Sequence, residues 1–145
     1  MKKRSTPVTR NLSRNFTLVE IMVVVVILVM LASIATPLYF NHLKNSRIAT
    51  AKTQIALLEQ ALADYRLDTG DYPDDLEALT ENIENNSKWS GPYIKPAVPQ
   101  DPWGRDYVYI KPGDHGEYDL LSYGKDGRSG GEGEDADITN YVEKN

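Results

Sequence analysis

The chain has 145 residues, enough for one domain with a modest hydrophobic core. It contains no cysteine, which excludes a disulfide framework and a thiolate metal site. Residues 1–15 carry five Lys and Arg and no acid, whereas the rest carries 11 Lys and Arg against 21 Asp and Glu. The basic cluster precedes an apolar run, a pattern that orients membrane proteins, and the remainder is acidic. We therefore do not expect nucleic-acid binding.

Residues 16–36 form an apolar run of 21 residues, about 31 Å as a helix, which matches the hydrocarbon core of a bilayer. The preceding basic segment predicts a cytoplasmic N-terminus, with the acidic remainder across the membrane. A cleaved signal peptide is an alternative, because Ser33-Ile34-Ala35 resembles a cleavage site. Neither a plain anchor nor a signal peptide explains Glu20, a carboxylate near the start of the run that is costly in hydrocarbon.

The sequence "FTLVE" around Glu20, behind a short basic leader, resembles the N-terminus of type IV pilins and type II secretion pseudopilins. The resemblance implies that a prepilin peptidase cuts between Asn15 and Phe16 and methylates the new amine. It further implies that Glu20 neutralises the Phe16 amine of a neighbouring subunit, and a buried pair of this kind can fix the register between helices. The family prefers Gly before the Phe, so Asn15 departs from its pattern at the cleavage site.

A second helical pattern follows the apolar run. Its apolar residues recur at spacings of three and four, which predicts an amphipathic helix over residues 38–67 with one face in a core. These residues are Ile48, Ala51, Ile55, Leu58, Leu62 and Tyr65. We expect Pro37 to kink the long helix rather than end it, and Gly70 to stop it.

The C-terminal part reads as loops and strands. Pro73-Asp74 is expected to open a short helix, and the polar residues 82–99 to form a connecting loop. Strand character follows, with turn residues at 111–116 that predict an antiparallel hairpin. The strand residues are Tyr107, Tyr109 and Leu121. The fold class is therefore α+β, with a long N-terminal helix, half membrane-spanning and half amphipathic, packed on a small antiparallel sheet.

Four further segments sharpen the resemblance to the major pseudopilins, the G subunits, of type II secretion systems. They are "YP" at 72–73, "DPWG" at 101–104, Tyr107, and "SYGKDGRSGGEGEDADI" at 122–138. Adhesive type IV pilins usually carry a cysteine pair, which this chain lacks. We interpret DPWG structurally, as a turn opened by Asp-Pro, with Trp103 in the core and Gly104 permitting tight backbone.

The loop over residues 122–138 contains five carboxylates among four glycines within residues 126–137. Oxygen ligands from a flexible loop suit calcium better than a transition metal, although a solvated acidic loop is the alternative. The resemblance implies one structural calcium ion in this loop. The expected ligands are the side chains of Asp126 and Asp135, with Asp137 as the alternative second carboxylate, and the backbone carbonyls near Tyr123 and Arg128.

The sequence shows no catalytic constellation, so we do not expect an enzyme. The expected organisation is a leader (1–15), a transmembrane and polymerisation helix (16–37), an amphipathic helix (38–67) and a periplasmic region (68–145). The resemblance implies a pseudopilus subunit, stored in the bacterial inner membrane and assembled into a periplasmic filament that drives export of folded proteins. Implied partners are further copies, minor pseudopilins, the prepilin peptidase, and the assembly platform with its ATPase. Two alternatives are an adhesive or motility pilin, and a secreted monomeric calcium- or carbohydrate-binding domain.

Overall fold

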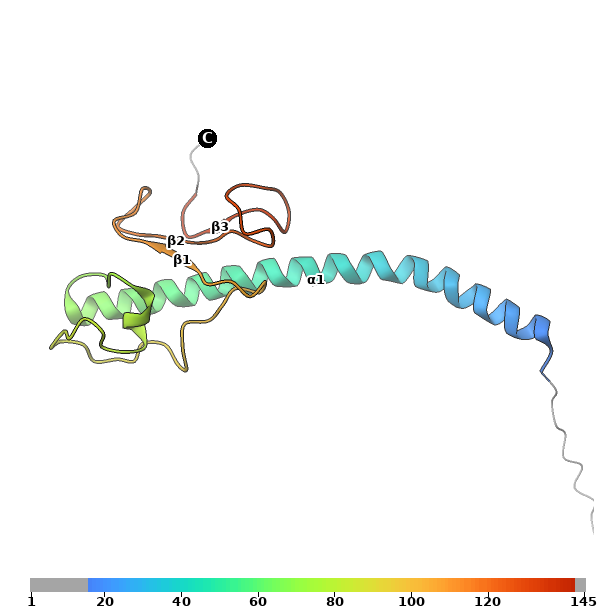
Figure 1. The fold of residues 1–145 in the computed structure, drawn as a ribbon, viewed down its shortest axis with the longest axis horizontal. Helices are drawn as coiled ribbons and strands as arrows, with labels where there is room; N and C mark the ends of the chain where they lie inside the picture. The colour runs from blue at the N-terminus through green and yellow to red at the C-terminus, as the bar shows by residue number, and fades with distance from the viewer. Residues whose placement is uncertain (1–15, 143–145) are drawn as a thin grey trace, which may run out of the picture. The chain divides into compact units, whose positions relative to one another are not determined.

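The structure is a computed structural model that describes residues 16–142, so the basic leader and Asn15 lie outside the described residues. The chain divides into two units, Met1–Phe40 and Asn41–Asn145. The elements in chain order are the helix α1 (Leu18–Thr69), the 3-10 helix η1 (Leu76–Leu79), and the strands β1 (Val108–Ile110), β2 (Asp119–Ser122) and β3 (Ile138–Thr139) (Figure 1).

The helix α1 contains both the apolar and the amphipathic segment, as the sequence predicts. Pro37 lies inside it without ending it. The helix ends at Thr69, where Gly70 adopts a φ of +98° and donates its N–H to the carbonyl of Arg66 at 2.8 Å. This left-handed backbone favours glycine, so Gly70 stops the helix as expected.

The short helix after α1 begins later than predicted. The short helix η1 is a 3-10 helix capped by Asp75, whose Oδ1 accepts the N–H of Glu77 at 2.8 Å, and Pro73-Asp74 does not open it. Asp75 takes the extended backbone conformation that suits an N-cap. Pro73 is instead buried in the core, and the Asp74 carboxylate pairs with Lys111 Nζ at 3.2 Å.

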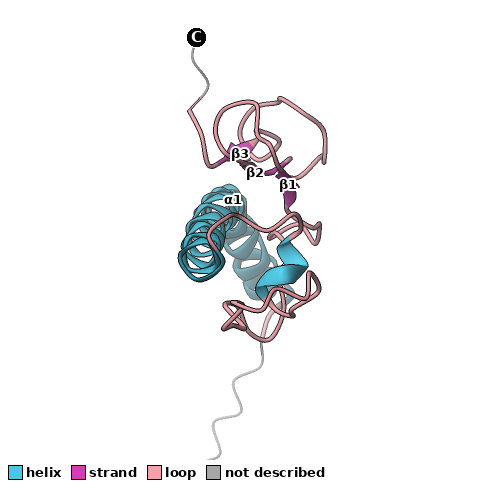
Figure 2. Cartoon of the chain, turned by 90° about the vertical axis from the view of Figure 1, so that its left-hand side faces the viewer, coloured by secondary structure: helices cyan, strands magenta, loops and turns pink. Residues whose placement is uncertain are grey.

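The sheet is antiparallel with strand order β1-β2-β3, and Figure 2 shows the strands and η1 on different sides of α1. Tyr109 pairs with Leu120 between β1 and β2, and Leu121 pairs with Thr139 between β2 and β3. The predicted hairpin is therefore confirmed, although Tyr107 lies just before β1 and packs into the core. The sequence did not predict β3, because two residues are too few for an alternating pattern.

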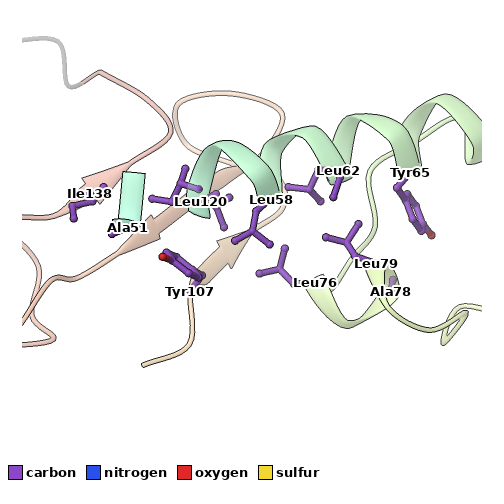
Figure 3. Close-up of a cluster of buried hydrophobic side chains, with 12 residues drawn as sticks. Ala51, Leu58, Leu62, Tyr65, Leu76, Ala78, Leu79, Tyr107, Leu120 and Ile138 are labelled. Carbon is purple, nitrogen blue, oxygen red and sulfur yellow. The ribbon is translucent and has the colours of Figure 1, made fainter. Parts of the chain in front are cut away.

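The predicted stripe of α1 forms the centre of the core. Leu58 and Leu62 have no exposed surface and point toward Leu76 and Leu79 of η1 (Figure 3). Ile48 is half-buried at the edge of the cluster. Complete burial of a leucine contributes about 1.5–3 kcal/mol, so each of these side chains stabilises the second unit substantially.

The DPWG segment has the structural role predicted for it. Gly104 adopts a φ of +85° and donates its N–H to the carbonyl of Asp101 at 2.9 Å, which forms a tight turn. Trp103 is half-buried and packs against the core cluster.

Candidate assembly helix and candidate calcium loop

The described residues of Met1–Phe40 present an exposed apolar surface. The helix that begins here is long and apolar enough to cross a membrane, by length and composition. Leu18, Leu28 and Leu38 are 78%, 58% and 58% exposed. None of residues 16–40 belongs to the hydrophobic core cluster. Such a large apolar surface is typical of a segment that contacts lipid or other protein chains.

Glu20 lies in the first turn of α1 and is exposed. Its backbone N–H is bonded to Thr17 Oγ1 at 3.2 Å, which is one half of a capping box at the start of the helix. Phe16, the predicted first mature residue, is 73% exposed at the same end of the helix. The structure therefore places the two predicted assembly residues together at the start of α1, where no cation of residues 16–142 forms an ion pair with Glu20.

The predicted calcium loop is closed by contacts between its two ends. The N–H of Lys125 donates to the carbonyl of Glu134 at 2.8 Å. Gly124 has a φ of +61°, and a Cβ at this position would lie 2.5 Å from the same carbonyl oxygen, so only glycine fits. The Glu134 carboxylate faces Lys125 Nζ at 3.5 Å and Arg47 Nη1 of α1 at 3.7 Å. The loop is thus folded on itself and attached to the helix.

The structure does not gather the predicted calcium ligands into one cluster of side chains. Within residues 16–142 there is no group of three or more His, Asp or Glu side chains that could hold a metal. Asp126 is exposed, and its Oδ1 accepts the N–H of Arg128 at 3.1 Å. Asp135 and Tyr123 are half-buried. A metal in this loop would therefore need backbone carbonyls besides carboxylates.

Asp137 has a carboxylate oxygen, unpaired among the described residues, that fits a cation ligand. Its Oδ2 accepts the N–H of Gly130 at 2.9 Å. Its Oδ1 is buried and has no hydrogen-bond partner in the described part of the chain. A buried carboxylate oxygen without a partner is costly, and hard cations such as Ca²⁺ prefer this ligand. The donor set of the loop therefore fits an oxygen-seeking cation, and the unpaired oxygen favours Asp137 over Asp135.

Two residues that the sequence analysis did not connect with the loop hold its first turn. Arg105 Nη1 donates to the carbonyls of Gly124 at 2.7 Å and Lys125 at 2.8 Å. Asp101 Oδ2 accepts the hydroxyl of Ser122 at 2.6 Å. These contacts join segments about twenty residues apart in the chain, and no local pattern signals them.

The comparisons with known proteins agree on one family. Residues 38–141 match the family described as type II secretion system (T2SS), protein G. The chain is similar to the Type II secretion system core protein G of Vibrio cholerae, with 46% identity over 87% of this chain and 90% of the relative. It is also similar to the protein of that name from Escherichia coli K12, with 45% identity over 88% of this chain and 90% of the relative.

A solved structure supports the same relationship. The crystal structure of the major pseudopilin from the type 2 secretion system of enterohaemorrhagic Escherichia coli is similar with a TM-score of 0.56 and 30% identity. The similarity covers 70% of this chain and 91% of that chain. It confirms the predicted pilin-like α+β fold, in which a long helix packs on a small antiparallel sheet. The chain therefore belongs to the type II secretion system protein G family.

Proposed function

We propose that this chain is a non-enzymatic structural subunit of the pseudopilus in type II protein secretion. The observation that carries the proposal is the apolar half of α1, whose side chains over residues 16–40 are all exposed. A subunit polymerised through its N-terminal helices would bury this surface against neighbouring copies, and before assembly a bilayer would cover it. Membership of the protein G family supports the same function.

We place the stored subunit in the inner membrane as a single-pass protein. The five basic residues of the leader favour a cytoplasmic N-terminus, and the acidic remainder would then be periplasmic. The partners are further copies of the chain and minor pseudopilins in the filament. The prepilin peptidase and the assembly platform with its ATPase act on the membrane-bound form.

Phe16 and Glu20 have defined roles in this proposal. Cleavage after Asn15 releases the α-amine of Phe16, which carries a positive charge at the membrane interface. The Glu20 carboxylate of a neighbouring subunit neutralises that amine, and the one-to-one pairing sets the stagger between adjacent helices. The position of both residues at the start of α1 supports this assignment.

The test is mass determination of the mature N-terminus of protein purified from membranes. We expect a chain that begins at Phe16 and carries one N-methyl group. A chain that begins at Thr36 would establish the signal-peptide alternative and remove the polymerising helix. An intact Met1 would mean that Asn15 blocks the peptidase.

We further propose that the loop over residues 122–138 binds one structural calcium ion. Asp126 and Asp137 would supply carboxylate oxygens, with Asp135 as the alternative to Asp137, and the carbonyls near Tyr123 and Arg128 would complete the oxygen shell. The buried, unpaired Oδ1 of Asp137 supports the proposal. A bound ion would neutralise the acidic loop and keep it ordered.

Calcium should raise the thermal stability of the detergent-solubilised chain. Free calcium at a hundredfold excess over the dissociation constant stabilises a folded state by about 2.7 kcal/mol. We expect a higher melting temperature in calcium than in chelator, and Asp126→Ala should remove most of the difference. If the unmodified chain melts at the same temperature in calcium and in chelator, the loop is a solvated acidic segment and not a calcium site.

A further inference from the structure

The turn at residues 101–105 is held by its own hydrogen bonds, independently of its contacts with the loop. Asp101 is buried, and its Oδ1 accepts the N–H of Trp103 at 3.0 Å and the N–H of Arg105 at 2.9 Å. The N–H of Asp101 donates in return to the carbonyl of Arg105 at 2.7 Å. The backbone of Arg105 is therefore held by two hydrogen bonds to Asp101, which fix the direction in which its side chain leaves the turn.

The same carboxylate attaches this turn to the end of β2. Asp101 Oδ2 accepts the hydroxyl of Ser122 at 2.6 Å, and Ser122 Oγ accepts the N–H of Gly124 at 3.2 Å. Ser122 is buried, so both bonds are shielded from water. The turn and the first residues of the loop are consequently held as one unit.

The guanidinium of Arg105 lies against the first loop turn, although the residue as a whole is exposed. Its Nη1 donates to two successive carbonyls, those of Gly124 at 2.7 Å and Lys125 at 2.8 Å. Gly127 has a φ of +70°, and a Cβ there would lie 2.6 Å from Arg105 Nε. The backbone of residues 124–127 thus lies close against the guanidinium, which satisfies two carbonyl oxygens as a bound cation would.

We propose that Arg105 is a positioning residue for the calcium site, which holds residues 124–127 closed before the ion binds. The inference rests on the calcium site proposed above. Because Arg105 already bonds the carbonyls of Gly124 and Lys125, it leaves those of Tyr123 and Arg128 for the ion. If the turn is already formed, calcium binding does not have to offset the conformational entropy lost on ordering it.

The charge of Arg105 alone predicts the opposite effect. A guanidinium close to a divalent cation repels it, so removal of the charge would tighten calcium binding. Removal of a positioning contact weakens binding, because calcium must then order the turn itself. The sign of the change in calcium affinity therefore separates the two effects.

The experiment compares the detergent-solubilised full chain with Arg105→Gln, Arg105→Lys and, as a control, Lys88→Gln, which removes an exposed charge elsewhere. Calorimetric titration with calcium should give a dissociation constant about tenfold higher for Arg105→Gln, the change expected from ordering roughly one residue. Arg105→Lys keeps the charge and one donor nitrogen, and its dissociation constant should fall between those of Arg105→Gln and the unmodified chain. Lys88→Gln should bind calcium as the unmodified chain does.

Trypsin provides a readout that needs no calcium. Lys125 and Arg128 are exposed cleavage sites within the loop. In chelator, Arg105→Gln should be cut at these two positions about tenfold faster than the unmodified chain, because exposure to protease follows the free energy of local opening. Saturating calcium should restore protection.

Unchanged or tighter calcium binding by Arg105→Gln would overturn the proposal. If Arg105→Gln does not fold, the calcium affinity of Arg105→Lys is the test, and unchanged or tighter binding by that variant would overturn the proposal. Another outcome is that the unmodified chain binds no calcium while Arg105→Gln is still cut faster in chelator. That result would refute the calcium site and leave Arg105 as a residue that only closes the loop. Equal cleavage rates in chelator would remove that role as well.

Discussion

The two units of the chain reach stability by opposite routes. Residues 41–142 enclose their own core, in which Leu58, Leu62 and Leu79 have no exposed surface. Residues 16–40 contain no buried side chain, although they are the most apolar part of the sequence. An apolar stretch of sequence therefore need not form part of the hydrophobic core. The first unit leaves its apolar side chains exposed, whereas the second buries its own, so the effects of substitutions in the two units should be separable in experiments.

The largest effect should come from Glu20→Gln. A buried amine that loses its counter-charge costs about 3–5 kcal/mol, which predicts at least about a hundredfold loss of assembled filament. Filaments released from the periplasm by cell lysis should be quantified at equal levels of membrane-bound protein. The thermal unfolding of residues 41–142 should not change. Glu81→Gln, which neutralises an exposed acid of the second unit, is the matched control and should assemble normally. Normal filament yield from Glu20→Gln would show that the carboxylate does not set the stagger.

Truncation of a core side chain in the second unit should instead change the unfolding of that unit. Leu62→Ala removes a fully buried side chain and should lower the free energy of unfolding by about 2–5 kcal/mol. Urea unfolding followed by the fluorescence of Trp89 and Trp103 measures this loss. Leu28→Ala, at a position that is 58% exposed, is the matched control and should leave this transition unchanged. A change below about 1 kcal/mol for Leu62→Ala would mean that the site collapses around the truncation.

The smallest effect concerns acid stability and Asp119. Burial alone would raise the pKa of Asp119, but hydrogen bonds from His115 Nδ1 and the backbone N–H groups of Asp114 and His115 outweigh it and hold the pKa below its ordinary value. The stabilisation is complete above the unfolded-state pKa of about 3.9 and is lost as the pH falls through the lower folded-state pKa.

Asp119→Asn should therefore make the acid limb of stability shallower. The melting temperature of the unmodified chain should fall more steeply below about pH 4 than that of the variant. Asp114→Asn, in which an exposed carboxylate is replaced, serves as the control and should retain the original slope. Identical slopes for Asp119→Asn and the unmodified chain would assign the acid dependence to other carboxylates.

The local features of this fold were predictable from the sequence. The spacing of Ala51, Ile55, Leu58 and Leu62 predicted the buried face of α1, because helical periodicity is written in neighbouring residues. Gly70 predicted the helix end, because glycine adopts the left-handed backbone that terminates a helix. The short helix was predicted to open at Pro73-Asp74, but Asp75 caps it, and Asp74 instead pairs with Lys111, a contact that no local pattern signals.

The contacts that shape the candidate calcium loop were not predictable in this way. The bond of Asp101 to Ser122 and those of Arg105 to Gly124 and Lys125 depend on two segments meeting in space. The sequence could name the acidic residues of the loop but could not rank Asp135 against Asp137. That ranking depends on which carboxylate oxygen folding leaves buried and unpaired, as it does in Asp137.

The two-residue strand β3 has a consequence for the order of folding. It pairs with β2 across the intervening residues 123–137, whereas β1 and β2 are joined through only residues 111–118. The longer closure has the greater entropic cost, and β3 adds pairs to only Leu121 and Ser122. The hairpin should therefore form first and β3 dock last. In the folded state β3 should also be the first strand to detach, which would open the acidic loop while the hairpin and the helix remain native.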